Sequence, residues 1–253
     1  PQIDLLVKSM IMTKKDIPFY LFPILFIFIL ACQPQKKKAS GDTMIVSGSI
    51  EGLRKGTLYL QKIEDTLLVN IDSTLVKGTP KFEFNTQIET PEVFYLYLDK
   101  EDGDSLNDRI LFFGEKGNIE INTLLKTFES SAEIKGSKNQ ELLQEHIAFK
   151  RKFNDQNLEL IKGFYQAQSN GEIERADSLE KQLNNLTRRR YLYTINFAAQ
   201  HTDQNIAPYL ALTEVYDANL SLLDSIAVKM TPEVRSSKYG KEFLKYLEER
   251  REE

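Results

Sequence analysis

The feature that most constrains this chain is a change in the spacing of its apolar residues near Ser137. Before it, apolar and polar side chains alternate, as in Phe82-Glu83-Phe84, which predicts β-strands with one buried face and one wet face. After it, apolar residues return every three or four positions, which predicts amphipathic helices. We therefore expect an α+β protein, with an N-terminal antiparallel β-sandwich or open barrel over residues 44–137 followed by an all-α helical bundle over residues 138–253.

Eight segments of the first part show the strand pattern. Glycine, proline, asparagine and aspartate separate them, and these residue types tolerate positive φ or fix a bend. Many short strands at this spacing are typical of a sandwich or barrel. The strands are expected at residues 44–51, 57–63, 67–76, 81–88, 92–98, 109–114, 118–122 and 132–136.

Two long helices are expected first in the second part. Ser137 and Gln140 have capping-box spacing at the start of one helix, and Ser169-Asn170-Gly171 ends it. The short turn predicts an antiparallel hairpin with a second helix. The first apolar stripe consists of Leu142, His146, Phe149, Phe153, Leu160 and Phe164, and the second of Ile173, Ala176, Leu179, Leu183, Leu186, Tyr193 and Phe197.

Shorter helices are expected after the hairpin. Asn205 is the expected cap of a helix that runs to about residue 219, and Ser221 with Asp224 is the expected start of another. Thr231-Pro232 places proline at a first helical position. The last helix should turn four side chains inward, namely Tyr239, Phe243, Tyr246 and Leu247.

A different signal precedes the folded part. Lys14 and Lys15 are followed by an apolar run over residues 17–31, which is interrupted by Pro18 and Pro23. A membrane-spanning helix needs about twenty apolar residues, and this run is shorter. The order of positive, apolar and small residues therefore favours a cleaved signal peptide within residues 1–31. The residues before Met10 are interpreted as upstream sequence.

The apolar run ends in the chain's only cysteine. Ile29-Leu30-Ala31-Cys32 resembles the bacterial lipobox, and this resemblance implies that Cys32 is lipidated and becomes the mature N-terminus. The alternative is an ordinary signal peptide that ends near a buried cysteine. Without a second cysteine, an intrachain disulfide is excluded. Cys32 is thus the one predicted functional residue, and we expect no catalytic, cofactor-binding or metal-binding residue.

The lipobox also implies a location. We expect an acyl anchor at Cys32 that holds the protein on a membrane of the bacterial cell envelope, facing the periplasm, with the outer membrane favoured over the inner one. Residues 32–43 are polar and unpatterned, so they are expected to form a solvated tether. Contact of Lys36, Lys37 and Lys38 with anionic head groups is the alternative reading of that tether.

A run of short motifs gives a second resemblance. Their order and spacing are similar to domain of unknown function 4369, a β-rich module of Gram-negative envelope lipoproteins, over about residues 44–145. The motifs are Val46-x-Gly48-x-Ile50-x-Gly52, Leu58-Tyr59-Leu60, Ile71-Asp72-Ser73-Thr74, Phe82-x-Phe84, Pro91-x-x-Phe94-x-Leu96, Phe113-x-Glu115-x-Gly117-x-Ile119-x-Ile121 and Ile134-x-Gly136-Ser137.

This resemblance implies a neighbour that the sequence does not contain. In that family the module usually precedes a helical connector and a thioredoxin-like domain with a Trp-Cys-x-x-Cys site. This chain has no tryptophan and no cysteine after Cys32, so the implied redox chemistry falls on none of its residues.

Other candidate sites are weak. His146 and His201 lack the third and fourth ligands of a zinc site. The glycine of the acidic stretch at residues 99–108 is misplaced for an EF-hand, so the stretch is interpreted as a solvated hairpin loop. Weak calcium binding is the alternative. Arg188-Arg189-Arg190 points in three directions on a helix, so ion pairs are favoured over an anion site.

The composition narrows the function. With a net charge of −4, the chain has no broad basic surface for nucleic acid. We expect a non-catalytic binding or interaction lipoprotein without a cofactor, with an envelope protein as a possible partner. Tyr95 and Tyr97 alternate in one strand and either meet a partner or lie under the helices, the second being favoured. The alternative function is the N-terminal part of a thioredoxin-like thiol-disulfide oxidoreductase whose catalytic domain lies beyond Glu253; a frayed charged end is the other reading of residues 248–253.

Overall fold

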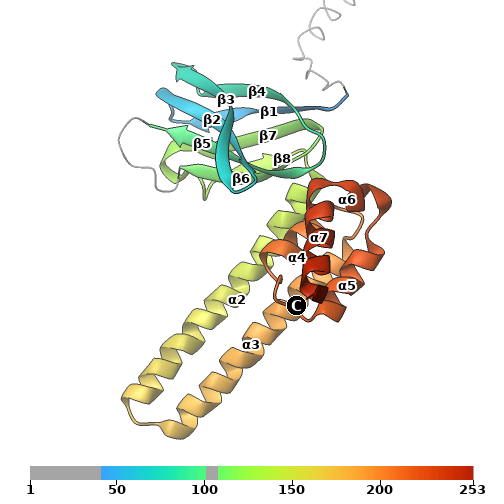
Figure 1. The fold of residues 1–253 in the computed structure, drawn as a ribbon. Helices are drawn as coiled ribbons and strands as arrows, with labels where there is room; N and C mark the ends of the chain where they lie inside the picture. The colour runs from blue at the N-terminus through green and yellow to red at the C-terminus, as the bar shows by residue number, and fades with distance from the viewer. Residues whose placement is uncertain (1–40, 101–107, 253) are drawn as a thin grey trace, which may run out of the picture. The chain divides into compact units, whose positions relative to one another are not determined.

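A computed structural model describes residues 41–100 and 108–252 (Figure 1). Its N-terminal half contains two four-stranded sheets, which do not close into a barrel. All eight expected strands are confirmed. In order across the first sheet they are β4 (Lys81–Gln87), β1 (Thr43–Glu51), β7 (Gly117–Leu124) and β8 (Glu133–Lys135), and across the second sheet β3 (Leu67–Lys77), β2 (Lys55–Glu64), β5 (Glu92–Asp99) and β6 (Arg109–Gly114).

One strand pair departs from the expected antiparallel arrangement. β1 and β7 run parallel, with Val46 beside Ile119 and Gly48 beside Ile121, whereas the other neighbouring pairs are antiparallel. A parallel pair needs a long crossover, and here the whole second sheet lies between the two strands in sequence. Alternation of side chains predicts the faces of a strand but not the direction of its neighbour. The contact also explains a glycine, because a Cβ at residue 48 would collide with the Ile121 carbonyl oxygen.

The inner faces of the two sheets enclose one apolar core. Phe84 and Ile121 of the first sheet pack with Leu58, Leu96 and Phe112 of the second sheet, and all five side chains are buried. These residues occupy every second position of their strands, as the period-two pattern requires. The next residues along β5 and β6 point the other way and are free to meet the helices.

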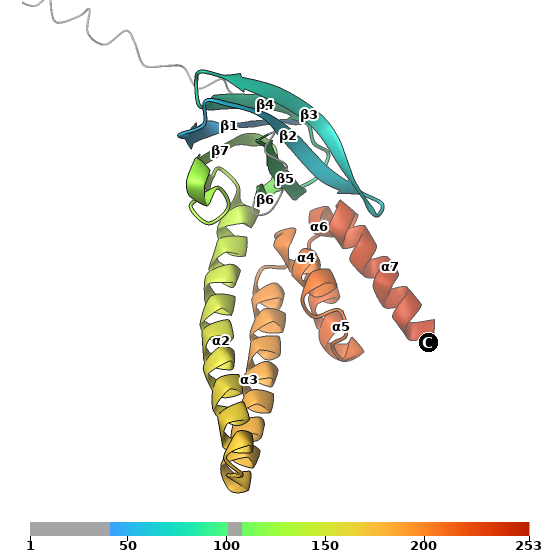
Figure 2. The same cartoon turned by 90° about the vertical axis from the view of Figure 1, so that its left-hand side faces the viewer.

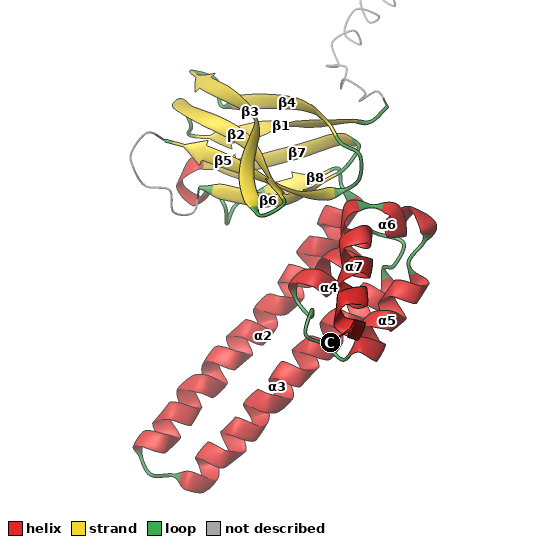
Figure 3. Cartoon of the chain, in the orientation of Figure 1, coloured by secondary structure: helices red, strands yellow, loops and turns green. Residues whose placement is uncertain are grey.

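The C-terminal half is helical, and Figure 3 shows the division between strands and helices. The helices are α2 (Lys138–Ser169), α3 (Ile173–Gln200), α4 (Ile206–Thr213), α5 (Leu220–Lys229), α6 (Pro232–Ser236) and α7 (Lys238–Glu252). A 3-10 turn, η3 (Leu125–Thr127), precedes β8. α2 and α3 form the expected antiparallel hairpin, as two views agree (Figures 1 and 2). Within residues 41–100 and 108–252, no helix combines the length and apolar character needed to cross a membrane.

Two of the expected helix starts are confirmed by their hydrogen bonds. The Ser137 hydroxyl accepts a bond from the Gln140 backbone N–H at 3.0 Å. The Thr231 hydroxyl accepts one from the Val234 backbone N–H at 3.3 Å, and proline occupies the first turn of α6. Each bond satisfies a backbone donor that has no partner within its helix.

Two other expected caps are wrong. The Asn205 side chain does not cap α4; instead Asn139 of α2 reaches across, and its Oδ1 accepts a bond of 2.9 Å from the Ile206 N–H. α4 ends at Thr213 rather than near residue 219. Ser221 lies inside α5, and Asn219 is the cap, with its Oδ1 2.9 Å from the Ser221 nitrogen. A cap supplied by another helix leaves no local sequence signal.

One expected stripe residue is also wrong. The Ile173 side chain is 74% exposed, although Ala176 and Leu186 of the same stripe are buried. Ile173 is the first residue of α3 and follows the turn at the tip of the hairpin. Periodicity places a residue on a helical face, but burial also needs a neighbour that extends as far as that residue.

The helices pack against the outer face of the second sheet. Val93 and Phe113 of the paired strands β5 and β6 join a buried cluster with Leu142, Phe197 and Leu210 from three helices. Gln140 of α2 also binds the edge strand β6, because its Oε1 accepts a bond of 2.7 Å from the Phe113 N–H. The Phe113 N–H is therefore not available for pairing with another strand.

Tyr95 and Tyr97 were expected either to meet a partner or to lie under the helices, and the packing differs between them. Tyr95 packs against the helix-covered cluster, as favoured. Tyr97 lies further along the strand, where its ring stacks on Tyr59 with 5.8 Å between centroids. The guanidinium carbon of Arg109 lies 4.5 Å from the Tyr97 ring centroid. Only the first of the two tyrosines therefore belongs to the contact between sheet and helices.

Candidate functional site

Two of the sites considered from the sequence fall wholly or mostly outside the described residues. Cys32 and the tether belong to residues 1–40, and most of the acidic stretch belongs to residues 101–107. At the end of that stretch, Asp108 is buried and its Oδ1 lies 2.9 Å from Lys100 Nζ. Lipidation of Cys32 and the reading of the acidic loop therefore stay predictions.

His146 is a core residue in this structure. Its side chain is 1% exposed, its Nε2 lies 3.1 Å from Thr194 Oγ1, and its ring stacks on Tyr193. Burial lowers the pKa of His146; Glu214 opposes this shift, whereas Lys150 and Arg190 add to it. The ring is consequently neutral near pH 7. Across the described ranges, no three His, Cys, Asp or Glu side chains are grouped as metal ligands would be.

The described residues also form a concave site that the sequence did not indicate. A cleft of about 790 Å³ opens between the second sheet and the helices α4 and α7, and we call it the Glu92 cleft. Its lining comes from five parts of the chain, namely Lys62, Ile63, Glu64 and Asp65, then Gln87, Ile88, Glu89 and Thr90, then Glu92, Val93 and Tyr95 of β5, Tyr209 and Thr213 of α4, and Lys238, Tyr239 and Glu242 of α7.

Glu92 is held between two lysines. Its Oε2 lies 2.5 Å from Lys238 Nζ, and its Oε1 lies 3.6 Å from Lys62 Nζ. Lys238 Nζ also donates a bond of 3.0 Å to the Ile63 carbonyl, and the Lys238 N–H bonds the Thr90 hydroxyl. Since Lys238 is the first residue of α7, these bonds join that helix to the sheet at the cleft.

The charges around Lys62 keep this side chain protonated. Partial burial alone would lower the pKa of Lys62, but its bond to Glu64 and the charge of Glu92 more than offset this and raise the pKa. An amine acts as a nucleophile only after it has lost its proton. The arrangement therefore suits Lys62 to ion pairing.

Tyrosine rings form the inner wall of the Glu92 cleft. Tyr209 and Tyr239 lie with their centroids 5.2 Å apart, and both pack edge-on against the buried Phe113. The Tyr239 hydroxyl accepts a bond of 3.0 Å from the Val93 N–H. Burial raises the pKa of Tyr209 to about 12 and also raises the pKa of Tyr239. Both phenols are thus neutral at pH 7.

Carboxylates outnumber amines around this wall. The lining contains five of them and only two lysines, and both lysines already contact Glu92. Glu242 is exposed on α7; partial desolvation raises its pKa, the charge of Lys238 opposes the shift, and the charge of Glu92 adds to it. A positive group bound near the Glu242 carboxyl would stabilise its ionised form.

The sequence could not have revealed this site. Its residues lie in five separate parts of the chain between positions 62 and 242, and only the contact between sheet and helices brings them together. None of them forms a recognisable motif. The one usable signal was Tyr95, an aromatic residue on the polar face of a strand.

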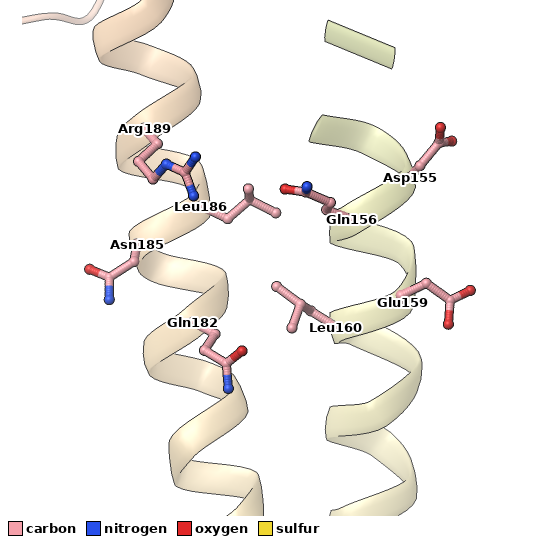
Figure 4. Close-up of a pocket in the computed structure, with 8 residues that line it drawn as sticks. All are labelled: Asp155, Gln156, Glu159, Leu160, Gln182, Asn185, Leu186 and Arg189. Carbon is pink, nitrogen blue, oxygen red and sulfur yellow. The ribbon is translucent and has the colours of Figure 1, made fainter. Parts of the chain in front are cut away.

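A second concave surface lies on the helical hairpin (Figure 4). This groove of about 570 Å³ has Leu160 of α2 and Leu186 of α3 directed toward each other between the helices. Its rims are polar, with Asp155 and Glu159 on one side and Arg189 on the other. The Arg189 guanidinium lies 6.0 Å from the Phe153 ring centroid, and the ion pairs expected of residues 188–190 stay a prediction.

The comparison with known families identifies the first part of the chain. Residues 44–143 match the model described as Domain of unknown function (DUF4369), which confirms the resemblance seen in the strand motifs. The match spans the two sheets and the first turn of α2. No catalytic thioredoxin domain is detected in this chain. Among curated proteins, no match was found.

Proposed function

We propose that this chain, which carries a DUF4369 domain, is a non-catalytic lipoprotein of the bacterial cell envelope. The observation that carries the proposal is the apolar segment that ends in Ile29-Leu30-Ala31-Cys32, the chain's only cysteine. Acyl chains on Cys32 anchor the protein to the membrane, and the folded part faces the periplasm, with the outer membrane as the favoured location. The strand motifs support this reading, because they resemble a module of Gram-negative envelope lipoproteins.

The folded part acts by binding. The Glu92 cleft has the size of a small-molecule or side-chain site, and it offers both apolar and charged groups. The pKa values of Lys62 and of the cleft tyrosines Tyr209 and Tyr239 are raised, so these groups stay protonated at neutral pH and are not poised as nucleophiles or bases. These observations support recognition of a ligand or an envelope protein and favour it over catalysis.

Membrane fractionation tests the location. Envelopes from cells that produce the full chain are separated on a density gradient, and intact and permeabilised cells are treated with protease. The expected result is protein in the outer-membrane fraction that is digested only after permeabilisation. Protein in the cytosolic fraction, or equally digested before and after permeabilisation, would contradict the proposed location.

The alternative is that the chain is the N-terminal part of a thioredoxin-like thiol-disulfide oxidoreductase. The DUF4369 match favours it, because the resemblance places this module upstream of such a domain. The coding sequence after Glu253 separates the two proposals. An open frame that encodes Trp-Cys-x-x-Cys supports the oxidoreductase, whereas an immediate stop codon excludes it.

A further inference from the structure

We propose that the Glu92 cleft binds an organic cation, that is, an alkylammonium or guanidinium group carried on an apolar chain. This ligand class deepens the binding role proposed above and therefore rests on it, but it does not depend on the acyl anchor. The cleft is built from described residues of both sheet and helices. Three of its properties, namely shape, aromatic wall and charge, point to the same ligand.

The shape accommodates a small ligand or one long side chain. Sites for small molecules usually measure about 300–1,000 Å³, and this cleft measures about 790 Å³. On the sheet side Ile63 is 42% exposed and offers apolar surface, whereas Ile88 and Val93 of the lining are buried. An alkyl chain of a few methylenes would cover the exposed Ile63 side chain and gain about 0.8 kcal/mol for each buried methylene.

The aromatic wall favours a positive head group. Tyr95, Tyr209 and Tyr239 all line the cleft, and the faces of neutral aromatic rings attract cations. The structure already contains one such contact, because Lys238 Nζ lies 5.8 Å from the Tyr239 ring centroid. The raised pKa of Tyr209 keeps its ring in the neutral form. Burial likewise raises the pKa of Tyr95, with Arg109 opposing the shift.

The surplus of carboxylates in the lining favours a ligand with a positive charge. Glu92 takes up both lysines of the cleft, and Glu64 contacts Lys62 as well. Asp65, Glu89 and Glu242 then remain in the lining without an ion pair among the described residues. An anionic ligand would meet uncompensated negative charge, whereas a cation would be attracted to it.

Three probes with one six-carbon chain test the proposal. Hexylammonium chloride, 1-hexanol and sodium hexanoate are titrated separately into the full chain, which is purified in detergent, at pH 7 and constant ionic strength. The readout is the NMR shift of isotope-labelled tyrosine rings, and single Tyr→Phe variants assign the three cleft tyrosines. Hexylammonium should give saturable shifts of these rings, with a dissociation constant at least tenfold lower than those of the other probes.

Paired variants locate the site. Tyr95→Leu removes an aromatic ring and should weaken hexylammonium binding by about 3- to 30-fold. Tyr95→Phe keeps the ring and should bind like the wild type. Glu242→Gln should weaken binding by about threefold, since it removes one unpaired carboxylate. Glu180→Gln, on the exposed face of α3, is the matched control and should have no effect. Circular dichroism confirms that each variant is folded.

The outcomes separate this inference from the proposal beneath it. Equal affinity for all three probes, or a preference for hexanoate, would contradict the proposed positive charge of the ligand. The binding role of the cleft would still stand. Saturable shifts that Tyr95→Leu and Glu242→Gln leave unchanged place the site elsewhere and also overturn the inference. Absence of saturation with every probe overturns both the ligand class and the binding role of the cleft, while the anchor at Cys32 is judged by its own experiments.

Discussion

Replacing Cys32 by serine should move nearly all of the protein from the membrane to the soluble periplasmic fraction. The serine hydroxyl cannot form the thioether through which a lipobox cysteine carries its lipid, so every attached acyl chain is lost. Each buried methylene contributes about 0.8 kcal/mol to membrane binding, and stable anchoring takes two acyl chains. This change is therefore the largest single effect that we expect on location.

The experiment compares Cys32→Ser with Ser40→Ala, a change of similar size in the same predicted tether. Cells are grown with an alkyne-labelled fatty acid, fractionated and analysed for label and for gel mobility. Wild type and Ser40→Ala should carry the label and sediment with the membrane, whereas Cys32→Ser should lose both properties. Unchanged sedimentation and mobility of Cys32→Ser would show that the anchor lies elsewhere.

Phe113→Ala should cause the largest loss of stability among single changes at the contact between sheet and helices. Phe113 is 0% exposed, and its ring packs edge-on against Tyr209 at 5.6 Å and Tyr239 at 5.9 Å. Truncating a buried phenylalanine leaves a cavity and typically costs about 3–5 kcal/mol. Because a whole domain is stable by only about 5–15 kcal/mol, the free energy of unfolding should fall by a large fraction.

Urea unfolding followed by far-UV circular dichroism measures this loss. Phe164→Ala on the helical hairpin is the matched control; its ring is only partly buried, so its truncation should cost less than half as much. A loss below about 1 kcal/mol for Phe113→Ala would mean that the helices hold the sheet weakly. The tyrosine wall of the Glu92 cleft rests on this ring, so the variant should also lose its affinity for hexylammonium.

The sequence was most informative where local pattern alone decides the structure. Phe82 and Phe84, or Ile119 and Ile121, alternate with polar residues because one face of a strand meets the core, and that alternation is visible without the fold. The Ser137 cap is equally local, because donor and acceptor lie three residues apart. Such features depend on a single stretch of chain.

Features that depend on two distant stretches were missed. β1 pairs with β7 in parallel although more than sixty residues separate them, and Asn139 rather than Asn205 caps α4. The Glu92 cleft belongs to the same class, since Glu92 and Lys238 meet only after the helices have packed on the sheet. Periodicity contains no information on which faces come together, and for that reason the candidate site was found only in three dimensions.

The central claim is that this protein acts at a membrane because Cys32 carries lipid. The intact mass of the wild-type protein, extracted from membranes with detergent, tests that claim most directly. The expected mass corresponds to a chain that begins at Cys32 and carries a diacylglyceryl group, with or without a third acyl chain. A mass that fits an unmodified chain, or one that begins at another residue, would contradict the claim.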